Sequence, residues 1–544
     1  MRFTSQVFFC LSILSVVSGF SQSFTRSDSL RGTITPQRVW WDLTYYHLDI
    51  KVKPDEKWLG GSNKVYYTVL ASNDAEMQID LQAPLNITKV MEEGEAIDFR
   101  KEGNAYFVSL QKPQRVGDSN FIEVYYEGNP REAVRAPWDG GVSWKKDEDG
   151  NHFVATSCQG LGASVWWPCK DHMYDEVDSM LISVEVPKNL TNVSNGRLRG
   201  VEENKEKKTK TFNWFVSNPI NNYGVNINIG NYATWNETYP GEKGDLDITY
   251  WALKQDKQKA KKQYQEVPRM LKALEHWFGP YPFYEDGYQL VQAPYLGMEH
   301  QSSITYGNDF GNGYLGRDLS TTGWGLKFDF IIVHESGHEW FANNLTHQDM
   351  ADMWLHESFT NYSESLFVEY YWGKEAGQEY VRGTRANIEN RKPMIGTYGV
   401  NDETYPIDVY YKGGNMLNTL RTILDDDERW RQLLRGLGKE FYHKTTTSAE
   451  VEKYIRDFTK LDLESFFNQY LRDARVPVLE YYFKDDLLHY RWINAIESLY
   501  MPVDVFLSGE KVRLFPQTVW GTHSTTATSL DIEPNFYVGE FRSR

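Results

Sequence analysis

The stretch that decides the fold is residues 328–345, FDFIIVHESGHEWFANNL. Its apolar start predicts a buried helix, on which residues four apart face the same way. His334 and His338 stand at this spacing, so one helix face can offer two imidazoles to a single metal ion. Glu335 follows the first histidine, where its carboxylate can accept a proton beside that ion. The stretch therefore predicts a metal site on a helix.

A third ligand is predicted downstream. Glu357 follows His338 after eighteen intervening residues, on a second predicted helix that begins near Asp349. Two imidazoles and one carboxylate leave the fourth position of a tetrahedral zinc ion open, which is typical of catalytic sites, whereas structural zinc sites close with four ligands rich in cysteine. No cysteine lies near these residues in the sequence. The ligand set predicts one catalytic zinc ion per chain.

Further residues of this region fit a hydrolase. Glu364 lies seven residues beyond Glu357 on nearly the same helix face, where it can accept the distal N–H of a ligating histidine. The alternative for Glu364 is a glutamate that contacts only solvent. Zinc lowers the pKa of a bound water, and Glu335 would take its proton and pass it to a leaving amine. This chemistry predicts hydrolysis of an amide bond.

The composition excludes some classes of partner. A chain of 544 residues predicts several domains rather than one binding module. Its 58 basic and 75 acidic residues give a net charge of −17, without long blocks of one sign. Binding of nucleic acid or of an anionic membrane is therefore not expected.

Hydrophobic patterning predicts an α+β multidomain fold. Short alternating runs over residues 22–238 predict an N-terminal antiparallel β domain. Helical periodicity dominates residues 239–475, which carry the metal motif. Alternation returns over residues 476–544 and predicts a small C-terminal β domain.

The first residues predict export. Residues 1–21 combine a basic start, an apolar run too short to span a membrane and small residues at the end, which is the pattern of a secretory signal peptide. We expect a secreted or periplasmic protein without a membrane span. Cys158 and Cys169 then remain, either as one disulfide or, as we expect, as free buried thiols.

With these motifs, the sequence resembles the aminopeptidase N family of zinc metallopeptidases, which also contains the leukotriene hydrolase. The spacing of the metal motif matches that family, and MWLHESFTNYSES, residues 353–365, is similar to its W-L-N-E-G-F-A stretch. His356 and Ser358 depart from the commonest residues there. The resemblance implies a thermolysin-like catalytic domain of the gluzincin type. Many relatives add a long C-terminal helical domain, which we do not expect here, so we expect a site that is more open or closed by oligomerisation.

A second motif concerns the substrate amine. YLGMEH, residues 295–300, is similar to the family's G-x-M-E-N motif, from which Leu296 and His300 depart. The resemblance implies that Glu299 pairs with the free α-ammonium group of a peptide and that the backbone at Gly297 cradles the substrate carbonyl. Taken without the resemblance, Glu299 is a loop carboxylate after a strand.

Two further segments are similar to the family. VYYKGGNML, residues 409–417, carries its Y-x-K-G order, which implies that Tyr410, rather than its neighbour Tyr411, donates a hydrogen bond to the developing oxyanion. SCQGLGASVWWPCKD, residues 157–171, is similar to the segment that ends in P-C-x-D. There Gln159 is implied to reach the active site near the substrate amine, although by itself it also fits a turn.

The expected function is that of a secreted zinc aminopeptidase that hydrolyses N-terminal residues from peptides. A zinc endopeptidase or a lipid-epoxide hydrolase on the same scaffold is the first alternative, which Glu299 distinguishes because an endopeptidase needs no ammonium anchor. A non-catalytic binding protein of the same fold is the second. A carbohydrate-binding sandwich with an accidental HESGH string is the third.

Overall fold

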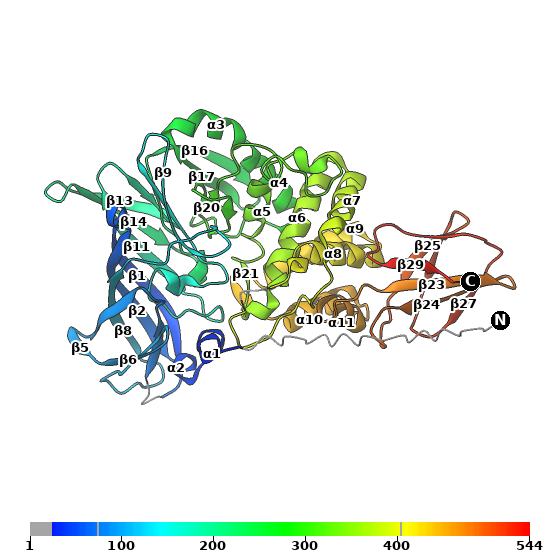
Figure 1. The fold of residues 1–544 in the computed structure, drawn as a ribbon, viewed down its shortest axis with the longest axis horizontal. Coiled ribbons are helices and arrows are strands. Elements are labelled where there is room, and N and C mark those ends of the chain that lie inside the picture. Colours follow the sequence, from blue (N-terminus) through cyan, green and yellow to red (C-terminus); the bar gives the residue numbers. More distant parts are fainter. Residues whose placement is uncertain (1–23, 73–75, 403–404, 544) are drawn as a thin grey trace, which may run out of the picture.

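The computed structural model describes residues 24–72, 76–402 and 405–543, so the predicted signal peptide lies outside the described residues. β-sheets of the N-terminal part, a helical middle part and a smaller group of C-terminal strands follow one another along the long axis of the molecule (Figure 1). This order confirms the predicted α+β multidomain fold. Within the described residues, no helix combines the length and apolar character that a membrane crossing requires.

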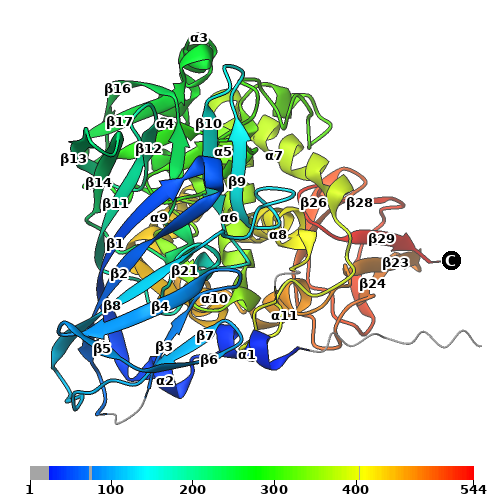
Figure 2. The ribbon, with the colours of Figure 1, turned by 60° about the vertical axis from the view of Figure 1, so that its left-hand side comes forward.

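The N-terminal β domain is built on an eight-stranded sheet with the order β13-β14-β11-β1-β2-β8-β4-β5 (Figure 2). Alternate residues of its central strand, such as Leu48, Ile50 and Val52, are buried, because successive side chains point to opposite faces of a sheet. The strands of this sheet are β1 (Trp41–Lys53), β2 (Trp58–Val69), β4 (Asn86–Glu92), β5 (Glu95–Ile97), β8 (Ser119–Gly128), β11 (Ser179–Pro187), β13 (Arg197–Asn204) and β14 (Thr209–Val216).

Two smaller sheets complete this domain, with the orders β12-β15-β10-β9 and β3-β7-β6. Cys158 and Cys169 are buried in its core as free thiols. The strands are β3 (Met77–Asp80), β6 (Phe99–Glu102), β7 (Ala105–Val108), β9 (Gly141–Lys146), β10 (His152–Ser157), β12 (Thr191–Val193) and β15 (Asn228–Gly230).

The middle part opens with a five-stranded sheet of order β16-β17-β18-β20-β19. Its strands are β16 (Tyr232–Gly241), β17 (Gly244–Leu253), β18 (Tyr288–Gln292), β19 (Gly297–Met298) and β20 (Ile304–Tyr306). The boundary predicted between residues 238 and 239 falls inside β16, and the domain boundaries stay predictions.

Helices form most of the rest of the middle part. In α4, Leu271, Leu274, Trp277 and Phe278 are buried at helical spacing, which explains why this segment folds as a helix against the core. The helices are α3 (Lys257–Gln263), α4 (Glu266–Phe278), α5 (Phe330–Gly337), α6 (Trp354–Trp372), α7 (Lys374–Gly383), α8 (Tyr411–Leu424), α9 (Asp427–Glu440), α10 (Ser448–Thr459) and α11 (Glu464–Leu471), and the short strands β21 (Leu345–His347) and β22 (Lys444–Thr446) pair in parallel.

The C-terminal part consists of two small sheets, ordered β27-β24-β23-β29 and β26-β25-β28, as the returning alternation predicts. Their strands are β23 (Val478–Lys484), β24 (Leu487–Ile493), β25 (Val503–Leu507), β26 (Glu510–Leu514), β27 (Gly521–Ser524), β28 (Leu530–Ile532) and β29 (Gly539–Arg542). At the other end of the chain, the short helices α1 (Arg26–Gly32) and α2 (Pro36–Val39) precede β1 at the edge of the β domain (Figure 1).

Candidate active site

Helix α5 presents the two histidines. Asp329 caps its N-terminus, and the Oδ1 atom accepts hydrogen bonds from the backbone N–H groups of Ile331 at 3.1 Å and Ile332 at 3.3 Å. The helix ends at Gly337, but His338 keeps helical dihedral angles of φ −64° and ψ −18°. The i, i+4 relation to His334 therefore persists, and the centroids of the two imidazole rings lie 5.0 Å apart.

Glu357, in the first turn of α6, faces both imidazoles. Its Oε2 atom lies 3.4 Å from Nε2 of His338 and 3.8 Å from Nε2 of His334. A tetrahedral zinc ion with ligand bonds of about 2.0–2.1 Å holds neighbouring ligand atoms roughly 3.3 Å apart. Although it is buried, Glu357 Oε2 has no hydrogen-bond partner among the described residues. A cation between the three side chains would satisfy it, so the residues fit a single zinc ion.

Two hydrogen bonds orient the ligand rings. Nδ1 of His334 lies 2.8 Å from Oε1 of Glu364, whose other oxygen accepts from the hydroxyl of Tyr380 at 2.6 Å. Nδ1 of His338 lies 3.0 Å from the backbone oxygen of Phe341. Both Nδ1 atoms are thereby engaged, which leaves each Nε2 atom for the metal. Glu364 is buried, whereas the alternative interpretation required a glutamate that contacts only solvent.

The charges of this cluster favour a cation. Burial opposes the charged form of His338, but the carboxylates of Glu357, Glu299 and Glu335 together outweigh it and raise the pKa of the imidazole to about 10. Burial also opposes the charge of Glu357, whereas the neighbouring His338 lowers the pKa of that carboxyl. The carboxylates around His338 therefore favour a positive charge at this point of the site.

A second set of possible ligands, Glu299, Glu335 and His338, lies within the same 4.8 Å spacing as the first. Oε1 of Glu299 already accepts hydrogen bonds from Gln159 at 2.7 Å and from Tyr223 at 3.1 Å. Burial raises the pKa of Glu335 to about 7. A carboxyl that titrates near neutral pH suits proton transfer. Because Oε2 of Glu357 has no hydrogen-bond partner in the described part of the chain, whereas Oε1 of Glu299 has two, the set with Glu357 is the better metal site.

Loops supply the opposite side of the site. The side-chain amide of Gln159 donates to Glu299 Oε1 at 2.7 Å and to Glu357 Oε1 at 3.2 Å, and its oxygen accepts from the Tyr405 hydroxyl at 3.4 Å. The hydroxyls of Tyr405 and Tyr410 lie 3.5 Å apart. The ring of Tyr410 also packs along His334. Gln159 is thus a site residue rather than only a turn residue.

Gly297 has a steric role. A Cβ atom at this position would lie 2.6 Å from a side-chain carbon of Ile331 and 2.9 Å from Oε1 of Glu335. Any side chain there would displace the carboxylate that is expected to move the proton. The close approach of the strand to α5 therefore requires glycine.

These residues line one cavity of about 430 Å³, a size usual for ligand sites. Sequence reasoning missed Tyr405 and Tyr223, which contact Gln159 and Glu299. Neither belongs to a motif or a periodic segment, so no local signal indicated them. Of the residues expected in the site, the cavity brings together Gln159, Gly297, Glu299, His334, Glu335, His338, Glu357 and Tyr410, while Glu364 lies behind His334.

Comparison with known families agrees with this geometry. Residues 43–223 match the Peptidase M1 N-terminal domain, and residues 263–470 match the Peptidase family M1 domain, which together cover more than half of the chain. The chain belongs to peptidase family M1. The resemblance to zinc metallopeptidases is confirmed, and the M1 catalytic domain contains the proposed zinc ligands.

Individual M1 relatives are distant. The chain is 24% identical over 379 residues to "Probable aminopeptidase 2" of Sulfurisphaera tokodaii, a match that covers 67% of this chain and 46% of that protein. It is 22% identical over 450 residues to "Leukotriene A-4 hydrolase" of Xenopus laevis, which covers 77% of this chain and 69% of that protein. The match thus spans about half the length of the first of these relatives.

A solved structure shows the same M1 fold. A mutant M1 zinc metallopeptidase from Deinococcus radiodurans, bound to a Tyr-Ser-Ala substrate, superposes with a TM-score of 0.65 at 20% identity. The match covers 80% of this chain and 94% of that chain. At this identity, the likeness establishes the fold of the M1 peptidase described here.

Proposed function

We propose that this protein is a zinc aminopeptidase that removes N-terminal residues from peptides. The observation that carries the proposal is the position of Glu299. Its buried carboxylate lies within the 4.8 Å group that includes Glu335 and His338, in the cavity that also holds the metal ligands. A carboxylate so close to the proposed metal site and to Glu335 can form a charge-assisted hydrogen bond with the α-ammonium group of a peptide, which only a free N-terminus provides.

The chain's own residues divide the chemistry. A zinc ion held by His334, His338 and Glu357 would supply a Lewis acid that polarises the scissile carbonyl and acidifies a water molecule. Glu335 takes the proton of the attacking water and passes it to the leaving amine, for which a pKa of about 7 is well suited. The Tyr410 hydroxyl donates a hydrogen bond to the oxygen on which negative charge develops.

Gln159 and Tyr405 prepare the substrate end of the site. The hydrogen bonds of Gln159 to Glu299 and of Tyr405 to Gln159 fix the carboxylate before a peptide enters. The α-ammonium group then pairs with Glu299, which aligns the first peptide bond with Glu335. Orientation of this kind lowers the entropy cost of the reaction.

We also propose that the protein is exported, since the pattern of residues 1–21 is that of a signal peptide. Oligomerisation is a further proposal, because an assembly could narrow the entrance to the cavity. Light scattering coupled to size-exclusion chromatography, with hydrolysis of peptides of increasing length, tests it. A monomer that rejects long peptides would contradict it.

Aminoacyl chromogenic substrates test the function. We expect hydrolysis of free-amine substrates, loss of activity with a chelator and recovery with one equivalent of zinc. The N-acetylated forms of the same substrates are the matched controls, and they should be cleaved far more slowly. Equal cleavage of free and acetylated substrates would favour the endopeptidase alternative, and no cleavage by zinc-loaded protein would favour a non-catalytic role.

A further inference from the structure

A segment outside every motif contacts both the loop that carries Gln159 and the loop of residues 398–402. We name residues 26–39, which comprise α1, α2 and the residues between them, the N-terminal clasp. The clasp contacts the β domain on one side and the loop of residues 398–402 of the catalytic domain on the other. It is not part of the cavity lining.

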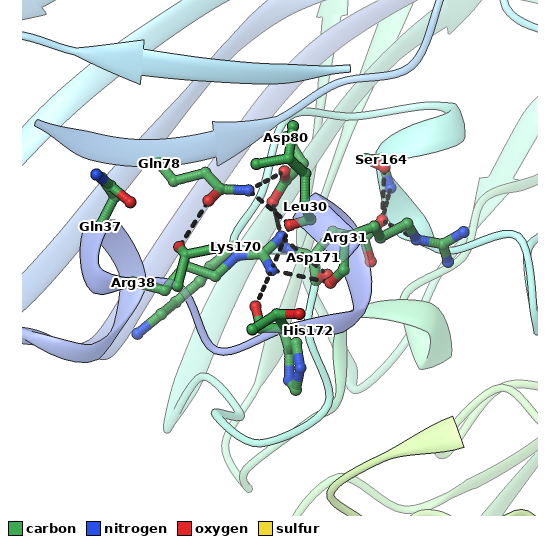
Figure 3. Close-up of polar contacts among 12 residues, drawn as sticks. Leu30, Arg31, Gln37, Arg38, Gln78, Asp80, Ser164, Lys170, Asp171 and His172 are labelled. Carbon is green, nitrogen blue, oxygen red and sulfur yellow. Dashed lines mark hydrogen bonds and ion pairs between the residues drawn. The ribbon is translucent and has the colours of Figure 1, made fainter. Parts of the chain in front are cut away.

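Arg38 fixes the conformation of the clasp. Its buried guanidinium donates hydrogen bonds from Nη1 to the backbone oxygens of Leu30 at 3.1 Å, Arg31 at 2.9 Å and Thr33 at 2.9 Å. Nη2 pairs with the carboxylate of Asp80, a residue of β3 (Figure 3). A buried charge with this many partners holds the backbone of the clasp in one arrangement on the β domain.

Arg31 extends from this anchored backbone to the loop that carries Gln159. Its Nη2 atom donates to the backbone oxygen of Gly160 at 2.8 Å, and Nε lies 3.4 Å from Oδ2 of Asp171. Gly162 packs so tightly here that a Cβ atom on it would lie 2.0 Å from Arg31 Nη2. The guanidinium therefore sets the path of the chain immediately after Gln159.

The clasp also holds the catalytic domain. The hydroxyl of Thr33 donates to the backbone oxygen of Gly399 at 2.8 Å, and the backbone N–H of Asn401 donates to the backbone oxygen of Asp28 at 3.3 Å. A Cβ atom on Gly32 would lie 2.2 Å from the backbone of Val400, so the two segments pack directly against each other. This loop leads along the chain towards Tyr405.

We propose that the N-terminal clasp positions the substrate-binding side of the active site, with Arg31 as the positioning residue for Gln159. The proposal rests on the proposed function, because Gln159 orients Glu299, and Glu299 is the residue proposed to bind the substrate amine. Arg31 is not among the described residues that line the cavity, and its guanidinium reaches Gln159 through the backbone of the loop of residues 159–162. Loss of Arg31 should therefore weaken the binding of free-amine substrates, while it slows the chemical step much less.

Kinetics of Arg31→Met test this with free-amine substrates. We expect KM to rise about tenfold with kcat changed less than about threefold, because orientation is lost while the catalytic groups remain. Zinc content should stay at one per chain. Arg31→Lys keeps a donor for the Gly160 oxygen, so its KM should lie between those of the wild type and Arg31→Met. The control is Arg26→Met, which removes an exposed ion pair between α1 and Glu102.

Hydrogen–deuterium exchange provides a readout that does not depend on activity. Residues 159–163 should exchange faster in Arg31→Met than in the wild type, and Arg26→Met should not change them. If neither KM nor exchange of this loop changes in Arg31→Met, or if Arg26→Met changes both equally, the positioning role is wrong. If the wild type cleaves no aminoacyl substrate, the proposed function fails, whereas exchange still tests the link from Arg31 to the loop.

Discussion

The two sides of the cavity are built differently. One side, the helix side, consists of His334, Glu335, His338 and Glu357, which lie on α5, at its C-terminal end and on α6, with Glu364 supporting His334 from behind. The other, the loop side, consists of Gln159, Glu299, Tyr405 and Tyr410, which come from separate segments and contact one another through side-chain hydrogen bonds. Under the proposed function, the helix side holds the metal and moves the proton, while the loop side orients the substrate.

Glu335→Gln should have the largest effect. The amide cannot accept a proton, so kcat should fall by at least about a thousandfold, whereas His334, His338 and Glu357 should still bind zinc. Turnover numbers and metal analysis of the purified variant check this. Substantial activity in a zinc-loaded variant would place the proton transfer elsewhere and would remove the chemistry from the helix side.

Tyr410→Phe tests the one loop-side residue with an expected role in the chemical step. Loss of the hydroxyl should lower kcat roughly a hundredfold with a smaller effect on KM, as for other oxyanion donors. Tyr411→Phe is the matched control, because Tyr411 also lines the cavity. A larger loss of kcat in Tyr411→Phe than in Tyr410→Phe would reverse the assignment of the two neighbours.

Glu364→Gln tests the hydrogen bond that orients the ring of His334. Without a carboxylate at 2.8 Å from Nδ1, His334 becomes a weaker ligand, and the affinity for zinc should fall about tenfold to a hundredfold. Competition with a chromophoric chelator measures this affinity. Glu375→Gln, on the exposed surface of α7, is the control. Unchanged affinity would mean that the metal site does not depend on its hydrogen-bonded surroundings.

Mild acid should lower the free energy of unfolding of the fold that supports the loop side. His172 uses both ring nitrogens as a neutral group, since Nε2 lies 3.1 Å from the Gly32 oxygen in the clasp and Nδ1 accepts from Tyr174 N–H at 3.2 Å. Burial, followed by the nearby charge of Arg38, lowers the pKa of His172 to about 3. His172 of the unfolded chain takes up a proton near pH 6.5, whereas that of the folded chain does not. The contribution of neutral His172 to the free energy of unfolding is therefore complete above pH 6.5 and is lost as the pH falls from there to about 3.

Because of His172 alone, the free energy of unfolding should be about 1 kcal/mol lower at pH 5.5 than at pH 7.5. Urea unfolding followed by tryptophan fluorescence at the two pH values measures the difference. His172→Gln should reduce the pH dependence by that amount. An equal pH dependence in the variant and the wild type would exclude His172 as its source.

The sequence predicts the helix side well because its information is local. His334 and His338 stand four residues apart at α5, Glu364 lies seven residues after Glu357 on α6, and Glu357 follows His338 at a spacing that the family shares. The domain order is equally readable from alternation and periodicity, although β16 extends across the boundary expected at residue 238.

The loop side depends on tertiary contacts, which a single sequence does not contain. Tyr405 reaches Gln159 across 246 positions of the chain, and no motif includes it. Tyr223 and the clasp residue Arg31 are likewise visible only once the domains are packed. Gln159 and Glu299 could be assigned from the family resemblance, but their mutual hydrogen bond could not.

The central claim is that His334, His338 and Glu357 hold one zinc ion. An anomalous difference map, collected at the zinc absorption edge from crystals of the zinc-loaded protein, tests it most directly. The account predicts a single strong peak per chain at about 2.0–2.1 Å from both Nε2 atoms and from the Glu357 carboxylate. A peak held by Glu299 and Glu335 instead, or no peak near these histidines, would contradict it.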